Sequence, residues 1–372
     1  MHTVLLAACL MSLGVWLLVL LAPWRPWSTR ERFETDGTTD QQVDDVTVLI
    51  PARNEAESIG PTLAALVLNG RPPVIVIDDE STDETATVVA STGIESLCLV
   101  SGTPTPAGWS GKLWALEQGI GRVRTSYVLL LDADIVLSPG TLQSLRRKLI
   151  NEDLGLVSLL AELHMAGFWE RLLMPVFVFF FKLLYPFAVS NSDTQTIAAA
   201  AGGCMLVRRD ALEGVHAFSS IREALIDDCT LARALKRTSH RTWVGLTRSA
   251  ISQRAYPRLV DIWNMVARTA YTQLRYSPLL LLLCTVSMVI VFWAPVAGLF
   301  FAETRVAALA GGITLMLAYI PTLRFYGRSL AWALTLPFSA TLFLAMTWTS
   351  AMRDWRGRRS YWKDRIYKRG EI

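Results

Sequence analysis

The stretch VIVIDDESTDET, Val74 to Thr85, sets a run of β-favouring aliphatic residues directly before a cluster of acids. An unbroken run of valine and isoleucine is typical of a strand buried on both faces of a sheet. Such charge is tolerated at the end of a buried strand where a ligand supplies hydrogen-bond donors or a cation lies nearby. The stretch therefore predicts a ligand site at this strand end. The acids of the stretch are Asp78, Asp79, Glu80, Asp83 and Glu84, and the first four of these carry the prediction.

Strands and helices alternate around this stretch. The apolar residues Ile59, Leu63 and Leu66, for example, recur at the spacing of a helix face. The alternation predicts an α/β fold with a Rossmann-like, mainly parallel sheet and helices on both of its faces. Ligands bind such sheets beyond the carboxyl ends of the strands. The predicted order is strand 46–52, helix 54–67, strand 74–78, helix 81–92, strand 96–100, helix 111–120 and strand 126–135.

Polar clusters follow several of the predicted strands. Residues 53–55 follow the first strand, residues 78–83 the second, and Asp132 and Asp134 the last. Two carboxylates separated by one residue, where a strand is turning, can share one Mg²⁺ or Mn²⁺ ion with a diphosphate. The clusters therefore predict a common site at one edge of the sheet.

A phospho-receiver domain is an alternative interpretation of the opening stretch, because its first strand also ends in paired acids that bind Mg²⁺. Here a strand and a helix precede the acidic pair, whereas a receiver begins with it. A further acidic pair, Asp227-Asp228, and the membrane-like segments also have no place in that fold.

The composition indicates that part of the chain lies in a bilayer. Of its 372 residues, 52% are hydrophobic and 18% are charged, which is apolar for a soluble protein. Residues 3–22 form a charge-free apolar run close to the ~20 residues that a spanning helix needs. A cleaved signal peptide is disfavoured because a basic start and a small-x-small cleavage site are missing. We expect an N-terminal anchor over 1–22, a linker over 23–45 and C-terminal transmembrane helices within 277–352.

Basic residues indicate the orientation of these segments. Three arginines follow the first apolar run, so the positive-inside rule places the middle of the chain in the cytoplasm. The basic tail, 353–372, also indicates the cytoplasm or anionic headgroups. Three spans after a cytoplasmic domain would leave that tail outside. Either one segment is re-entrant, with Pro295 and Pro337 as candidate breaks, or another segment crosses.

Two further segments indicate contact with the membrane surface. Residues 168–189 are very aromatic, but Lys182 and two prolines interrupt them, which favours an interfacial or re-entrant element over a span. A core helix of the α/β domain is the alternative. Residues 259–276, within the segment 251–276, predict an amphipathic helix with an apolar stripe and a polar stripe that includes Arg268.

Cysteine content and charge exclude other classes of protein. The five cysteines are odd in number and lack the spacing of metal ligands, which favours reduced thiols in the cytosol. The net charge of +4 is concentrated in the tail, and the sequence has no basic-aromatic motif of a nucleic-acid binder. We expect no nucleic-acid partner.

Six motifs, taken in order, resemble those of family 2 glycosyltransferases with the GT-A fold. The resemblance covers residues 46–276 and implies that 46–250 form the catalytic domain. Within that family, PAGWSGKLWALEQG and LIDDCTLARALKR are similar to the lipid-glycosylating branch of ceramide glucosyltransferases, and most similar to the hopene-associated glycosyltransferases of hopanoid-producing bacteria. The motifs are PARNE (51–55), DDESTD (78–83), GK (111–112), DAD (132–134), GGCMLVRR (202–209) and DDCTL (227–231).

The resemblance implies a nucleotide-sugar donor, with a UDP-sugar as the first expectation. Asp79, with Asp78 and Asp83 nearby, would accept hydrogen bonds from the base and the ribose. Capping of the next helix is the alternative for Asp83. Lys112 would meet a phosphate or a sugar hydroxyl, unless it is an ordinary surface lysine. The same motifs assign Pro51, Arg53 and Glu55 to donor binding.

The resemblance also implies a metal site and a general base. Asp134 would be the direct ligand of Mg²⁺ or Mn²⁺, and Asp132 would approach the ribose or the metal. Asp228 aligns with the catalytic carboxylate, with Asp227 beside it, and helix capping is the alternative for this pair. With no second carboxylate indicated as a nucleophile, a single displacement with inversion is expected. The Gln-x-x-Arg-Trp string of the branch is absent, and Gln253-Arg254 and Gln273-Leu274-Arg275-Tyr276 are partial echoes of it. Arg268, on the polar stripe of the predicted amphipathic helix, is the residue expected to close over the diphosphate.

The implied acceptor is a hydroxyl of a membrane lipid, such as a hopanoid, reached from the cytoplasmic side of a bacterial inner membrane. Transfer to a polyprenyl phosphate or a polysaccharide chain is one alternative. A non-catalytic membrane protein whose domain only binds a nucleotide is another.

Overall fold

The computed structural model describes residues 2–39, 42–194, 197–362 and 365–368. The chain divides into two units whose segments alternate along the sequence. An α/β unit is built from Glu31–His164 and Val189–Ala255, and the segment that begins at Tyr361 groups with it. A helical unit is built from the segment that ends at Arg30, from Met165–Ala188 and from Tyr256–Ser360. Every predicted site residue except Arg268 belongs to the α/β unit.

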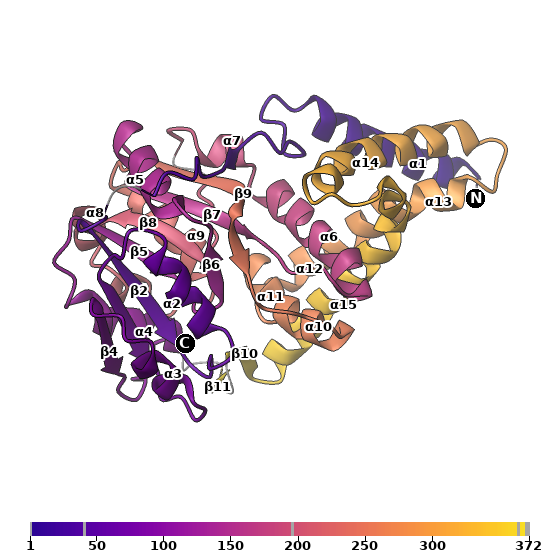
Figure 1. Cartoon of the computed structure of the whole chain (residues 1–372). Helices are drawn as coiled ribbons and strands as arrows, with labels where there is room; N and C mark the ends of the chain where they lie inside the picture. Colours follow the sequence, from indigo (N-terminus) through magenta and orange to yellow (C-terminus); the bar gives the residue numbers. More distant parts are fainter. Residues whose placement is uncertain (1, 40–41, 195–196, 363–364, 369–372) are drawn as a thin grey trace. The chain divides into compact units, whose positions relative to one another are not determined.

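The α/β unit is organised around one sheet with the strand order β1-β9-β7-β8-β5-β2-β3-β4, and β6 pairs with β9 (Figure 1). Most neighbours are parallel, but β8 runs antiparallel to β5 and β7, and β6 runs antiparallel to β9. The prediction of a mainly parallel α/β sheet is therefore confirmed. The strands are β1 (Arg32–Phe33), β2 (Val46–Ala52), β3 (Val74–Asp78), β4 (Leu97–Ser101), β5 (Tyr127–Leu131), β6 (Ile135–Leu137), β7 (Leu156–Glu162), β8 (Cys204–Arg208) and β9 (Thr242–Ser252).

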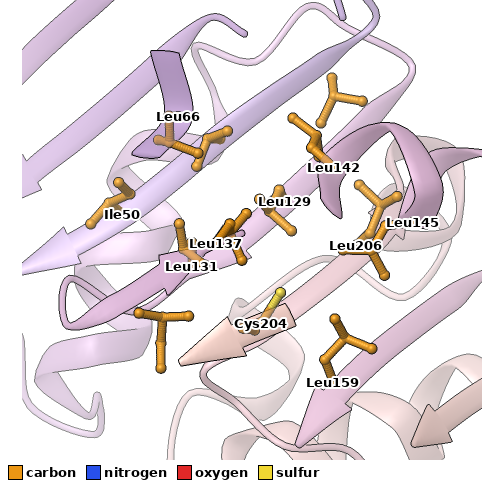
Figure 2. Close-up of a cluster of buried hydrophobic side chains, with 14 of the residues drawn as sticks. Ile50, Leu66, Leu129, Leu131, Leu137, Leu142, Leu145, Leu159, Cys204 and Leu206 are labelled. Carbon is orange, nitrogen blue, oxygen red and sulfur yellow. The ribbon is translucent and has the colours of Figure 1, made fainter. Parts of the chain in front are cut away.

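Helices cover both faces of this sheet, so every residue of β2 is buried. On one face, Ile50 and Leu129 belong to the same core cluster as Leu66 of α2 and Leu145 of α5 (Figure 2). The opposite face packs on α4, α8 and α9. The helices of this unit are α2 (Ile59–Val67), α3 (Thr85–Ser91), α4 (Gly111–Ile120), α5 (Thr141–Asn151), α8 (Arg209–Gly214), α9 (Asp227–Arg237) and the 3₁₀ turn Ser219–Ile221, while α7 (Phe187–Ser190) spans the sequence boundary between the units.

The predicted linker, residues 23–45, is in part a piece of the sheet. Its β1 pairs in parallel with β9, with Arg32 opposite Leu246. Glu34 then accepts a hydrogen bond of 2.9 Å from the Ser249 hydroxyl. The linker prediction misses this strand because backbone pairing over two residues leaves no periodicity in the sequence.

Among the described residues, four helical segments are long and apolar enough to cross a membrane: His2–Leu21, Pro278–Gly298, Arg305–Phe325 and Leu330–Trp355. Neither Pro295 nor Pro337 interrupts its segment. The elements of the helical unit are α1 (His2–Leu21), α6 (Phe168–Leu184), α10 (Leu259–Ala267), α11 (Ala270–Gln273), α12 (Pro278–Met288), the π-helical turn Val289–Trp293, α13 (Ala294–Gly298), α14 (Arg305–Phe325), the 3₁₀ segment Leu330–Thr335 and α15 (Leu336–Trp355). The strands β10 (Arg358–Trp362) and β11 (Arg365–Lys368) pair within the predicted tail.

Polar side chains of α1 bond to the π-helical turn. The Val291 carbonyl accepts hydrogen bonds from the Ser12 hydroxyl at 2.7 Å and from the Trp16 indole N–H at 3.3 Å. A π-helical turn displaces carbonyls from the regular ladder, and apolar surroundings require each of them to find a donor. These contacts fix α1 against the segment that follows α12.

The two predicted surface segments are both helical. Residues 168–188 belong to the helical unit, and Val189 belongs to the α/β unit. Their α6 continues through Pro175 and buries Lys182, whose ammonium donates to the carbonyls of Trp27 and Ser28. The predicted amphipathic helix over 259–276 is two helices, α10 and α11, because the chain leaves the helical conformation at Thr269.

Candidate active site

The loops after β2 and β3 hold each other at the carboxyl edge of the sheet. The Arg53 guanidinium donates to the carbonyl of Asp79 at 2.5 Å, and the Asn54 side-chain carbonyl accepts from the Thr82 N–H at 2.8 Å. Asn54 adopts a left-handed φ of 50°, which asparagine tolerates better than most residues. Pro51 is buried within β2. Arg53 and Asn54 therefore shape the rim of the predicted donor site.

The acids of the stretch 74–85 have different surroundings. Asp79 is completely buried, whereas Asp78 accepts a 3.2 Å hydrogen bond from the Ser81 N–H. Asp83 accepts from the N–H groups of Ala56 and Thr85. Burial alone would raise the pKa of Asp83, but these hydrogen bonds outweigh it and lower the pKa. Asp83 thus connects the residues before α3 to the β2 loop.

The Asp132-Ala133-Asp134 turn joins β5 to β6, and both carboxylates face cations. Lys112 Nζ lies 2.7 Å from Asp132 Oδ1, and Arg254 Nε lies 2.9 Å from Asp134 Oδ2. Burial raises the pKa of Asp132, the neighbouring carboxylate of Asp134 raises it further, and Lys112 opposes both effects. The turn is therefore a concentration of negative charge that is already matched by basic side chains.

Lys112 lies in the first turn of α4 and reaches several elements of the edge. Besides Asp132, its ammonium lies 3.6 Å from Asp227 Oδ2 and donates to the Gly202 carbonyl at 3.4 Å. Burial would lower the pKa of Lys112, but the surrounding carboxylates of Asp132 and Asp227 raise it above its usual value. Lys112 is therefore a charged group of the site and not an ordinary surface lysine.

Asp228 lies at the start of α9 and is held by backbone donors. Its Oδ2 accepts from the Gly202 N–H at 2.9 Å, and its Oδ1 accepts from the Cys229 N–H at 2.6 Å. Burial and the adjacent charge of Asp227 raise the pKa of Asp228 to about 6. A carboxylate with such a pKa is ionised at neutral pH and is more basic than an exposed aspartate.

Gly202 connects the two halves of the site because it has no side chain. A Cβ at this position would lie 3.3 Å from Lys112 Nζ and 3.4 Å from Asp228 Oδ2. The same residue bonds to both through its backbone. Any larger residue at 202 would therefore push against the ammonium and the carboxylate at once.

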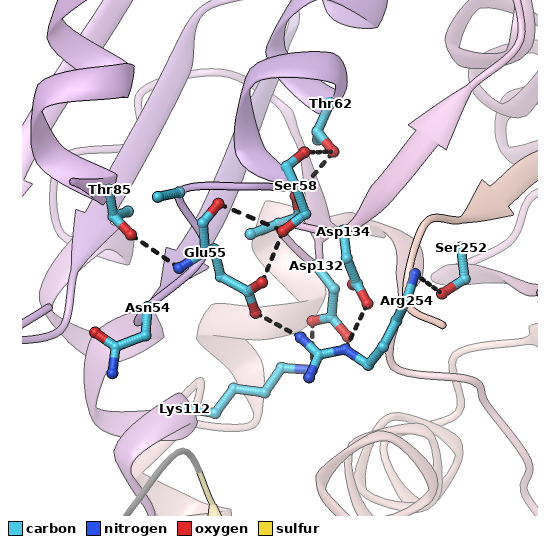
Figure 3. Close-up of polar contacts among 12 residues, drawn as sticks. Asn54, Glu55, Ser58, Thr62, Thr85, Lys112, Asp132, Asp134, Ser252 and Arg254 are labelled. Carbon is cyan, nitrogen blue, oxygen red and sulfur yellow. Dashed lines mark hydrogen bonds and ion pairs between the residues drawn. The ribbon is translucent and has the colours of Figure 1, made fainter. Parts of the chain in front are cut away.

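Sequence reasoning did not assign Arg254, which follows β9. Its guanidinium bridges Glu55 Oε1 at 2.6 Å and Asp134 Oδ2 at 2.9 Å (Figure 3). The Gln253 N–H also donates to the Asp134 carbonyl at 2.8 Å, so the end of β9 is attached to the acidic turn. The sequence signal for Arg254 is the pair Gln253-Arg254, a partial echo of the Gln-x-x-Arg-Trp string, but Arg268 is preferred on the sequence alone. Figure 3 shows Lys112 and Arg254 reaching the same turn from different elements.

The predicted site residues thus separate into three groups. Lys112 pairs with Asp132 and Asp227, and Arg254 pairs with Glu55 and Asp134, so two sets of ion pairs meet at the 132–134 turn. Gly202 attaches Asp228 to the first set. The acids at 78–83, with Arg53, form the adjoining rim. Arg268 lies exposed at the carboxyl end of α10 in the helical unit.

The chemistry of the acidic turn fits a divalent cation that binds together with a phosphate ligand. Asp132 and Asp134 offer hard oxygen ligands of the kind that Mg²⁺ and Mn²⁺ prefer. Within the described ranges, however, no group of three or more His, Cys, Asp or Glu side chains is arranged to hold a metal ion. Mg²⁺ is commonly held by one or two carboxylates and substrate phosphates, so two carboxylates suffice for such a site.

A mainly parallel sheet with helices on both faces and an acidic carboxyl edge is the arrangement expected of a GT-A fold. Residues 47–215 match the family described as "Glycosyl transferase family 2". The resemblance found in the sequence is confirmed at this level.

One curated relative and one solved structure illustrate the comparison. A 4,4'-diaponeurosporenoate glycosyltransferase of Staphylococcus aureus is 40% identical over 91 residues, which is 24% of each chain. The chain thus matches about a quarter of the length of this curated relative. A mannosyltransferase from Pyrobaculum calidifontis, solved with GDP-Man and Mn²⁺, has a TM-score of 0.55 and 19% identity, over 95% of this chain and 98% of that chain. This structural likeness shows a shared fold.

Proposed function

We propose that this protein is a membrane-bound, inverting glycosyltransferase that moves a sugar from a nucleotide-sugar, in the first instance a UDP-sugar, to a hydroxyl of a membrane lipid. One observation carries the proposal: at the carboxyl edge of a glycosyltransferase domain, Lys112 lies among Asp132, Asp227 and Asp228, and a shared glycine connects it to Asp228. The cation can stabilise the diphosphate anion that leaves, and a carboxylate of raised pKa can accept the proton of the attacking hydroxyl.

Asp228 is the proposed general base. Its pKa of about 6 leaves it ionised at neutral pH, so it can accept the proton of the attacking hydroxyl. The Gly202 N–H fixes the orientation of its carboxylate. Asp227 is turned toward Lys112 and serves as its counter-ion. No second carboxylate is assigned as a covalent nucleophile, which supports a direct displacement with inversion.

The donor diphosphate is proposed to bind where the basic side chains meet the acidic turn. Lys112 and Arg254 are positioned to bind its oxygens, and Asp132 and Asp134 would hold Mg²⁺ or Mn²⁺. A bound divalent cation supplies positive charge to the departing diphosphate. The rim residues are proposed to bind the base and ribose, and Arg268 is proposed to contact the diphosphate. Pro51 and Glu55, beside this rim, are also proposed to take part in donor binding, as are Arg53, Asp78, Asp79 and Asp83 of the rim.

Membrane attachment supports a lipid acceptor. Helical segments long and apolar enough to cross a membrane lie before and after the glycosyltransferase domain in sequence. The similarity to a 4,4'-diaponeurosporenoate glycosyltransferase, although limited to 91 residues, supports an apolar acceptor. We propose that the α/β unit faces the cytoplasm of a bacterial inner membrane and that the acceptor is a hopanoid or another lipid with a free hydroxyl.

The experiment that tests this function measures transfer to lipid. Purified protein in detergent is incubated with labelled UDP-sugars, MnCl₂ and a total bacterial lipid extract, and labelled lipids are separated and identified by mass spectrometry. We expect a labelled glycolipid with the wild-type protein and none with D228N. Saturable nucleotide-sugar binding without turnover in the wild-type protein would instead indicate a non-catalytic binding module.

A further inference from the structure

The proposed chemistry gives no role to the contact between Arg254 and the acidic turn. The guanidinium bonds at once to Glu55 and Asp134, whose side chains are each only 12% exposed. Charge-assisted bonds of 2.6 and 2.9 Å to shielded carboxylates are among the stronger contacts that a protein makes. Asp134 therefore already has a cationic partner before any ligand binds.

That partner occupies one of the two oxygens through which Asp134 could bind a metal ion. Arg254 Nε bonds to Oδ2 of Asp134, the residue expected to be the direct metal ligand. A divalent cation and a guanidinium repel each other, so each weakens the binding of the other to this carboxylate at close range. An incoming cation therefore competes with Arg254 for Asp134.

A diphosphate changes this competition. Arginine binds phosphate through parallel N–H groups as well as it binds a carboxylate. Glu55 would keep one side of the guanidinium in place while the other side turns from Asp134 to a phosphate oxygen. The nucleotide thus provides a second anion for Arg254 and frees Asp134 for the cation.

We propose that Arg254 is a positioning residue that competes with the divalent cation for Asp134 and so couples cation binding to the binding of the nucleotide. This inference rests on the proposed function and deepens it. Nucleotide phosphates promote cation binding in any such site because they supply ligands. The contribution of Arg254 to this coupling is the part that is lost when Arg254 is replaced. Thermodynamic linkage requires that the nucleotide strengthens cation binding by the same factor by which the cation strengthens nucleotide binding.

The test is the binding of Mn²⁺ to the full-length protein in detergent, followed by the electron paramagnetic resonance signal of free Mn²⁺, with and without UDP. Removing a charge-assisted competitor from a shielded carboxylate should tighten nucleotide-free Mn²⁺ binding about tenfold or more in R254Q. With saturating UDP, we expect the two proteins to differ by less than about threefold. R254K should lie between them, because an ammonium cannot bridge both carboxylates as a planar fork does.

R146Q is the matched control. Arg146 also makes short bonds to a carboxylate, that of Asp45, and its exposure of 32% is close to the 35% of Arg254. It lies on α5 outside the site, so its nucleotide-free Mn²⁺ affinity should equal that of the wild-type protein. Circular dichroism establishes that each variant is folded, and R254K provides the comparison if R254Q does not fold.

The outcomes separate the two levels of the proposal. The role of Arg254 is overturned if folded R254Q binds Mn²⁺ without nucleotide no more tightly than the wild-type protein does, while the wild-type protein binds Mn²⁺ with UDP. If R254Q does not fold, the same result with R254K overturns it. The proposed function stands in either case. A wild-type protein that binds no Mn²⁺ even with UDP would contradict the metal-dependent function itself, and the role of Arg254 with it.

Discussion

The peptide N–H of Gly202 donates to Asp228 Oδ2 at 2.9 Å, while the carbonyl of the same residue accepts from Lys112. One glycine therefore sets the distance between the proposed base and the main cation of the site. The residue contributes through its backbone and through the space that a missing side chain leaves. The spacing of the base and the cation thus depends on a position that has no functional group of its own.

Replacing Gly202 with alanine should lower kcat. The added Cβ would lie within 3.4 Å of both Lys112 Nζ and Asp228 Oδ2, so one of them must move. Misplacement of a catalytic group by a fraction of an ångström to 1 Å can cost about tenfold to a hundredfold in rate. Steady-state transfer kinetics measure the loss. G214A is the control, because an added Cβ there meets no heavy atom within 4 Å among the described residues.

Replacing Asp228 with asparagine should reduce kcat by about a hundredfold or more, the usual contribution of a general base. The amide keeps the size of the side chain and an acceptor oxygen for the Gly202 N–H, so nucleotide binding should persist. Isothermal titration with UDP and the transfer assay separate the two effects. D210N changes another aspartate in the first turn of a helix and should retain activity. Full activity in D228N would refute its role as the base.

The pH dependence of kcat should show an acidic limb with a midpoint of about 6, the raised pKa of Asp228. Below that pH the carboxylate is protonated and cannot accept the proton of the hydroxyl, so the rate falls about tenfold per pH unit. Stability changes in the opposite sense. Because the pKa is raised above the ordinary 3.8, this group's contribution to the free energy of unfolding is present at low pH and is lost as pH rises through about 6. Thermal melts of wild-type and D228N proteins between pH 4 and 7 measure the difference.

Replacing Lys112 with methionine should raise the KM for the nucleotide-sugar about tenfold, since a cation that pairs with phosphate and with two carboxylates is lost. The volume of the side chain is nearly preserved, which limits packing effects. K148M is the matched control, because Lys148 pairs with Glu152 on α5, away from the site. An unchanged KM in K112M would show that the diphosphate binds elsewhere.

Chelation of divalent cations should abolish transfer, and Mn²⁺ or Mg²⁺ should restore it. The expectation follows from the hard oxygen ligands of Asp132 and Asp134. D134N should need a metal concentration about tenfold higher for half-maximal rate, because one ligand loses its charge. A rate that is unchanged in excess EDTA would show that the basic side chains alone neutralise the diphosphate.

Local sequence patterns are sufficient to specify the central strands and the acids that follow them. Two strands, Val74–Asp78 and Tyr127–Leu131, consist mainly of apolar residues, so their burial does not depend on details of packing. Acidic residues stand at the end of the first strand and directly after the second. Because parallel strands end at one edge, the sequence also assigns Asp78 and Asp132 to a common site. The resemblance to glycosyltransferase motifs adds Lys112 and Asp228. These inferences need only local patterns and one general rule of sheet topology.

The roles of residues that arrive from distant elements depend on the tertiary structure. Gly202 meets Asp228 because β8 runs antiparallel between β5 and β7, an insertion that no periodicity indicates. Arg254 meets Glu55, 199 positions earlier, because β9 ends against the acidic turn. The pairing of β1 with β9 likewise depends on a partner far away in sequence. A pattern within one segment determines whether it forms a strand or a helix, but the contacts between ends of segments depend on the packing of the whole unit.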